Sequence, residues 1–177
     1  MANIACSTPR VPLEDASVFR HTATSRLFSR LLADLSALIE NERDIEHVDL
    51  FDPAFSGWLR AAEQAHESVS SGLLSLLDSP VQRAEDRALQ RMAFGLHALL
   101  KSEEPGEFKR IYDLIQRFPA AFICPGPSAF ARRSTVMLAT LRLRMTDLLS
   151  LTAFNDAYDI APDAELPDSV PFDLAPA

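Results

Sequence analysis

The stretch Leu59–Leu77, LRAAEQAHESVSSGLLSLL, decides the fold class of this chain. Apolar residues recur in it and just before it at seven-residue steps, which correspond to two turns of an α-helix and therefore to one helix face. This pattern predicts a long helix whose apolar seam packs against other helices. One row comprises Phe55, Ala62, Val69 and Leu76, and a neighbouring row comprises Leu59, His66 and Leu73.

Helical periodicity recurs over most of the chain. It predicts a first helix that begins after Pro12 or within residues 21–25 and ends near Glu42. It also predicts a short helix over residues 107–118 and a last helix over residues 128–154. The chain has few glycines and few β-branched residues, the residue types that disfavour helices. We therefore predict an all-α protein, an antiparallel bundle of four to five helices.

Capping patterns predict where the second and third helices start. Asp52 and Pro53 suit the N-cap and the first helical position, where the missing N–H of proline costs nothing. Ser79 and Pro80 repeat this arrangement, and Gln82 completes a capping box. We expect each helix to begin directly after its cap.

Small residues and a second apolar stripe predict how the helices pack. In the third helix, Ala84, Ala88 and Gly95 should let a neighbouring helix approach closely. A helix that is apolar on two sides is expected to lie centrally, with neighbours on both. The last helix is predicted to be such a helix, because a narrow second stripe comprises Val136, Ala139 and Leu143.

The net charge of the chain is concentrated at its C-terminus. The 177 residues carry a formal net charge of −8, and the six acids after Asn155 stand without any Lys or Arg. The rest of the chain is close to neutral, which argues against a dedicated DNA- or RNA-binding protein. We divide the chain into a flexible N-terminus (residues 1–12), a helical bundle (13–158) and a disordered acidic, Pro-rich tail (159–177).

The composition also predicts where the protein is found. Residues 1–12 lack the apolar core of a secretory signal, and no segment approaches the roughly 18 apolar residues of a membrane span. Arg greatly outnumbers Lys and Ala is frequent, which is typical of GC-rich bacterial genes. We therefore expect a bacterial cytoplasmic protein.

His66 is the first candidate for chemistry. Glu63 and His66 have the Glu-x-x-His spacing by which two metal ligands share a helix face, but a di-metal bundle needs a second such pair and further glutamates. The alternative is a core imidazole whose nitrogens bond neighbouring polar groups, because leaving them unpaired would cost about 1–3 kcal/mol. Without a second pair, we predict no resident metal.

Cys124 is the second candidate. Cys124–Pro125 is similar to the Cys-Pro dipeptide of haem-regulated proteins, where the thiolate ligates iron. That resemblance implies His66 or His97 as the axial partner. The alternative is a cysteine that packs as a small hydrophobe. No phosphate-binding loop, zinc spacing or catalytic triad is readable in the sequence, so we assign no catalytic residue and no cofactor.

Two arginines on the last helix are candidates for protein binding, and so is the acidic tail. Arg133 and Arg144 share a helix face and would form a docking strip for an acidic peptide, unless they only solubilise the helix. The tail either solubilises the chain or docks, since its acids would steer and its hydrophobic residues would anchor. These anchors are Leu166, Val170, Phe172 and Leu174.

Phe94, on the polar side of the third helix, would add a second interaction surface or a homodimer contact if it is exposed. The favoured function is a non-catalytic regulatory or adaptor protein, monomeric or dimeric. It would bind a protein partner through a bundle face, through the tail, or through both. The alternatives are a bundle that binds a small ligand, haem or a metal, and an enzyme whose carboxylate or histidine chemistry leaves no motif.

Overall fold

The computed structural model describes residues 21–46, 48–49, 51–102 and 106–154. In these ranges the chain forms helices and no strand, so the predicted all-α fold class is confirmed. The α-helices are α1 (Ala23–Ile45), α2 (Phe55–Leu77), α3 (Ala84–Leu100), α4 (Glu107–Arg117) and α5 (Ala129–Leu149). A short 3-10 helix, η1 (Pro119–Phe122), follows α4, and another, η2 (Thr152–Phe154), follows α5.

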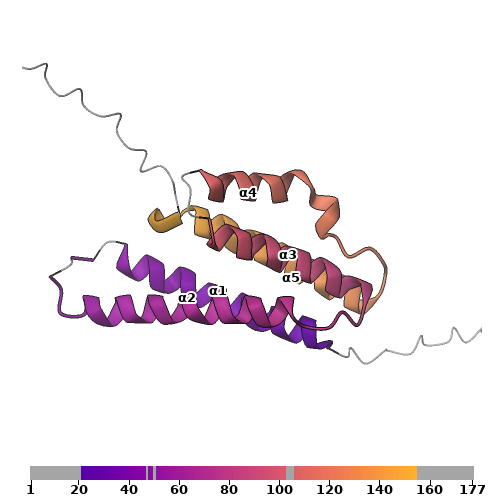
Figure 1. Ribbon diagram of the computed structural model, residues 1–177, viewed down its shortest axis with the longest axis horizontal. Coiled ribbons are helices and arrows are strands. Elements are labelled where there is room, and N and C mark those ends of the chain that lie inside the picture. The colour runs from indigo at the N-terminus through magenta and orange to yellow at the C-terminus, as the bar shows by residue number, and fades with distance from the viewer. Residues whose placement is uncertain (1–20, 47, 50, 103–105, 155–177) are drawn as a thin grey trace, which may run out of the picture.

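Successive helices run in opposite directions, so the chain passes back and forth through an antiparallel bundle (Figure 1). α1 packs most extensively along α2 and also contacts α3 and α5. α3 lies between α2 and α4 and contacts both (Figure 1). The helices of the described ranges include none with the length and hydrophobicity to cross a bilayer. The largest fully buried side chains come from α1, α2, α3 and α5 and include Phe28, Leu35, Leu73, Met92, Leu96 and Leu138.

The seven-residue seam of α2 faces the core as predicted. Ala62, Val69 and Leu76 are buried, and so is Leu73 of the neighbouring row. Leu59 begins that neighbouring row but is 38% exposed. The first row is therefore the packing surface, and the second row turns toward solvent near the start of the helix.

Gly95 on α3 makes the close helix approach that the sequence predicts. A Cβ atom built at Gly95 would lie 2.9 Å from Cδ1 of Ile115 on α4, so the end of the Ile115 side chain would have to shift to admit it. Ala88 is buried as expected, but Ala84 is exposed at the start of α3. Ile115 of α4 therefore packs where Gly95 has no side chain, and Ala84 has no part in this contact.

The prediction that α5 is packed on two sides is wrong. Its main stripe is buried, but Val136 and Leu143 of the second stripe are 64% and 67% exposed, and Ala139 is also exposed. α5 packs mainly against α1 and α3. The second stripe is therefore a surface feature, and α1 and α3 are the central helices.

Both predicted helix starts also need correction. Asp52 accepts the N–H of Ala54 at 2.8 Å, but in a turn that precedes α2, which begins at Phe55. α3 begins at Ala84, four residues after the predicted start at Pro80. Asp86, three residues after the N-cap, accepts the backbone N–H of Arg83 at 2.9 Å, so the capping carboxylate lies further along the chain than predicted.

Polar side chains of α1, α3 and the α2–α3 connection meet beside the start of α3. We call this group the polar junction: Thr22, Thr24, Ser79, Asp86 and Gln90. Asp86 is fully buried and accepts hydrogen bonds from the Thr22 hydroxyl at 2.8 Å and from the N–H of Gln82 at 2.9 Å. The hydroxyls of Thr24 and Ser79 lie 3.0 Å apart. Gln90 Nε2 donates to the carbonyl of Ser79 at 2.7 Å. These contacts fix the start of α1 to the α2–α3 connection.

Candidate protein-interaction surface

His66 lies on α2, half-buried, and close enough to Glu42 of α1 for their charges to interact. Burial raises the pKa of Glu42 above its ordinary value, the charge of His66 opposes that shift, and the charge of Glu46 adds to it. Glu63, the other half of the proposed metal pair, is exposed. Among the described residues, no three His, Cys, Asp or Glu side chains gather closely enough to hold a metal ion.

Cys124 lies after η1 and is buried against the start of α3. Its thiol lies 3.9 Å from the backbone carbonyl of Glu85, and burial, reinforced by the charge of Glu85, raises the thiol pKa. The protonated thiol is therefore favoured over the thiolate that would ligate iron. His66 lies beside the last turns of α1, whereas the start of α3 is at the other end of the bundle (Figure 1). The structure does not bring these two candidates together.

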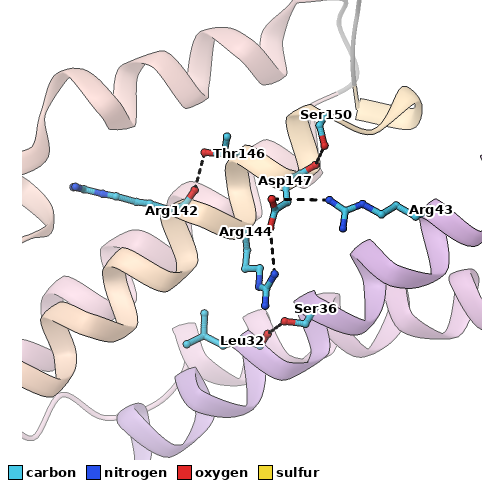
Figure 2. Close-up of polar contacts among 8 residues, drawn as sticks. All are labelled: Leu32, Ser36, Arg43, Arg142, Arg144, Thr146, Asp147 and Ser150. Atoms are coloured by element: carbon cyan, nitrogen blue, oxygen red, sulfur yellow. Dashed lines mark hydrogen bonds and ion pairs between the residues drawn. The ribbon is translucent and has the colours of Figure 1, made fainter.

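Arg144, one of the two predicted docking arginines, is already paired. Its Nη1 lies 3.2 Å from Asp147 Oδ2 on the same helix, and Nη2 of Arg43 on α1 lies 3.9 Å from Asp147 Oδ1 (Figure 2). We call Arg43, Arg144 and Asp147 the charged junction. Arg133 is exposed eleven residues earlier, about 16 Å along the helix axis. The two predicted docking arginines therefore have different surroundings.

Arg142 on α5 holds the η1 segment in place. Figure 2 shows its side chain pointing away from Asp147. Its Nη2 lies 3.4 Å from the carbonyl of Pro119, and its guanidinium carbon lies 5.9 Å from the centre of the Phe122 ring. This arginine is therefore engaged within the bundle, like Arg144.

Phe94 is exposed and lies beside two arginines. Its side chain on α3 is 64% exposed. Arg87 and Arg91 precede it by seven and three residues, a spacing that places all three side chains on one helix face. With Leu77 and Gln90 they line an open depression between α2 and α3. We call this set, Leu77, Arg87, Gln90, Arg91 and Phe94, the α3 surface.

One further exposed apolar residue, Leu74, flanks the α3 surface on the α2 side. Leu74 precedes Leu77 by three residues, so the two leucines are neighbours on the surface of α2. Leu74 is 59% exposed. The hydrophobic part of the surface therefore extends beyond the depression along α2.

α4 extends the apolar surface on the other side of α3. Ile115 packs against Gly95, and the Tyr112 hydroxyl lies 2.8 Å from the Thr146 hydroxyl of α5. At 100° per residue, Leu114 and Phe118 lie on the opposite side of Ile115 from Tyr112, and therefore away from α5. Each of these two side chains is 55% exposed. The exposed face of α3 thus has apolar residues of α2 on one side and of α4 on the other.

The α3 surface is positively charged. From Arg87 to Lys101 the chain carries Arg87, Arg91 and Lys101 and no acid, and the next acids, Glu103 and Glu104, come after the end of the helix. Arg91 Nε donates to the carbonyl of Arg87, and within the described part of the chain neither arginine forms an ion pair. Hydrophobic contact beside cationic hydrogen-bond donors is the chemistry that binds an acidic peptide.

The sequence analysis singled out Phe94 but missed Arg87 and Arg91. The signal is present in the sequence as the spacing of Arg87, Arg91 and Phe94 on one helix face. The predicted tail anchors, Leu166, Val170, Phe172 and Leu174, lie outside the described residues.

Comparison of the chain with protein-family models, with curated proteins and with solved structures finds no match.

Proposed function

We propose that the chain is a bacterial cytoplasmic protein of the regulatory or adaptor kind, without catalytic activity, and that it binds a protein partner through the α3 surface. The observation that supports this is the exposed ring of Phe94, which lies beside two arginines that pair with no carboxylate in the described ranges. Aromatic and arginine side chains contribute most to binding at protein interfaces. An exposed aromatic residue in such surroundings is typical of an interaction site.

Site-specific photo-crosslinking in the source cells tests the proposal. A photoreactive phenylalanine derivative replaces Phe94, and in a matched chain it replaces Leu143, which is 67% exposed on α5. We expect a discrete adduct with another protein from position 94 and none from position 143. The adduct should be lost when Arg87→Glu and Arg91→Glu are introduced together. Equal adducts from both positions, or adducts that ignore the two arginines, contradict the proposal.

A second pair of variants controls for the change in net charge. Arg132→Glu with Arg133→Glu makes the same charge change on exposed positions of α5. We expect this pair to leave the adduct from position 94 intact. If it removes the adduct as completely as the change at Arg87 and Arg91, the partner responds to net charge or to α5, and the α3 surface is not its binding site.

A further inference from the structure

We propose that the α3 surface is occupied, in the free protein, by the chain's own acidic segment 163–174. The proposal rests on the proposed function in that both use the same surface. It adds that the surface takes an acidic peptide with spaced hydrophobic anchors, and that the chain supplies such a peptide itself. A protein partner would then have to displace this segment.

Charge complementarity is the first argument. Segment 163–174 contains four acids and no base, whereas residues 87–101 carry two arginines of α3 and the C-cap Lys101, and no acid. Opposite charges of this kind steer a peptide to a surface and set its register. On α5, Arg144 is paired with Asp147 and Arg142 contacts Pro119 and Phe122, so the exposed Arg132 and Arg133 form the competing basic pair that the test controls for.

Hydrophobic complementarity is the second argument. The segment places Leu166, Val170, Phe172 and Leu174 between its acids. The α3 surface offers Phe94 and Leu77, and the exposed Leu74 lies one helical turn from Leu77 on α2. Burying exposed apolar side chains against one another stabilises the contact, and the prolines of the segment lower the conformational entropy that docking costs.

The length of the chain beyond Phe154 is the third argument. The Phe154 ring lies 5.5 Å from the ring of Phe108 at the start of α4, which is where α3 ends (Figure 1). Phe94 lies six residues before that end, about 9 Å along the axis. Residues 155–165 connect Phe154 to Leu166, and an extended chain of that length spans up to about 40 Å. The segment can therefore reach the α3 surface of its own chain.

The test uses the purified full-length chain with the photoreactive phenylalanine derivative at position 94, and no partner is present. Mass spectrometry maps the adducts. We expect a product of monomer mass in which position 94 is joined to residues 163–174. The same derivative at position 143 should give no such product. Because no partner is present, this result does not depend on the adducts formed in cells. Failure of the inference and failure of the proposed function are therefore distinguishable.

Charge reversal identifies the contact. Arg87→Glu with Arg91→Glu should lower the yield of the product by roughly threefold or more, because two favourable charge pairs become repulsive. Adding Asp168→Arg and Asp173→Arg to that variant should restore much of the yield. The control pair on α5, Arg132→Glu with Arg133→Glu, should leave it unchanged. Circular dichroism of each variant shows whether the bundle is still folded.

Four outcomes overturn the inference. Adducts scattered along the chain, or the same adducts from position 143, mean that the segment has no preferred binding site on the bundle. A product of dimer mass means that the occupant comes from a second copy. A yield that follows Arg132 and Arg133 means that the segment docks on α5. A yield that charge reversal does not alter means that the arginines of α3 do not bind the acids.

Discussion

α1 is joined to its neighbours by polar contacts at both ends, and the two sets differ in burial. At its start, the polar junction joins Thr22 to Asp86 of α3, which has no exposed surface, and joins Thr24 to Ser79 of the α2–α3 connection. Near its end, the charged junction joins Arg43 to Asp147 of α5, and the side chains of these residues are 50% and 34% exposed (Figure 2). Both sets contain a carboxylate, but only one carboxylate is shielded from water.

Burial should make the two junctions contribute very differently to stability. A buried carboxylate that loses its donors, or donors that lose their carboxylate, leave polar groups that water cannot reach. An exposed ion pair is screened by water and salt, and it constrains two long side chains. The comparison therefore predicts that the start of α1 depends on its hydrogen bonds, whereas the end depends mainly on apolar packing.

The largest effect should come from Asp86→Ala. The substitution leaves the Thr22 hydroxyl and the N–H groups of Gln82 and Arg83 without their acceptor. We expect the free energy of unfolding to fall by about 3 kcal/mol, the range for breaking a buried hydrogen-bond network. Urea titration followed by circular dichroism measures this. Asp147→Ala, which removes the carboxylate of the charged junction, is the matched control.

The control decides whether burial is the cause. Asp147→Ala should lower the free energy of unfolding by no more than about 1 kcal/mol, because its ion pairs are partly exposed. Equal losses for Asp86→Ala and Asp147→Ala would contradict the comparison.

An intermediate effect should come from Thr24→Val, which removes one hydroxyl of the polar junction and keeps the side-chain volume. Thr24 is fully buried and its hydroxyl lies 3.0 Å from that of Ser79. The Ser79 hydroxyl still donates to the carbonyl of Leu76, so no donor is left unpaired. We expect a loss of about 1 kcal/mol in the same urea titration. Ser36→Ala on α1, whose hydroxyl donates to the carbonyl of Leu32 in its own helix, is the control and should cost less.

The sequence predicted the helices better than it predicted these junctions. The seam of Ala62, Val69 and Leu76 follows from periodicity, because a seven-residue repeat has only one way to face a core. The contact between Thr22 and Asp86 joins residues 64 positions apart, and no local pattern signals it. Ser79–Pro80 gave the wrong helix start because a serine hydroxyl satisfies a carbonyl of the preceding helix as readily as it caps the next one.

The candidate surface was predictable only in part. Phe94 stands out in the sequence because an aromatic residue interrupts the polar face of its helix. The flanking residues Leu74 and Leu114 do not stand out, since their exposure depends on how α2 and α4 pack against α3. The second stripe of α5 shows the same limit, because Val136 and Leu143 would be buried only if another helix covered them. Periodicity gives the faces of a helix but not the number of its neighbours.

A small effect should come from Arg43→Ala at the charged junction. The guanidinium lies 3.9 Å from Asp147 Oδ1, and Arg144 remains to pair with the same carboxylate. We expect the free energy of unfolding to change by about 0.5 kcal/mol or less at low salt, and by less still at 1 M salt. Thermal unfolding at the two salt concentrations measures the difference. A loss that salt does not reduce would mean that Arg43 stabilises α1 by packing instead of by charge.

The smallest effect, and the one with a distinctive pH dependence, should come from Glu42→Gln near the same end of α1. Burial raises the pKa of Glu42 in the folded protein, the charge of His66 opposes the shift, and the charge of Glu46 adds to it. The folded state therefore binds the proton more tightly than the unfolded state does. For such a group, stability is highest below the unfolded pKa and falls as the pH rises through the folded pKa.

Glutamine removes this dependence because it is neutral at every pH. We expect Glu42→Gln to be more stable than the unmodified chain at pH 7, by about 0.5 kcal/mol or less, since the side chain is only partly buried. The difference should be much smaller at pH 4, where glutamate is mostly protonated in the unfolded state as well. Urea titrations at pH 4 and pH 7 measure it, with Glu40→Gln at an exposed position of α1 as the control. If the two variants show the same pH dependence, burial does not set the ionisation of Glu42, and its carboxylate is as accessible to water as that of the exposed Glu40.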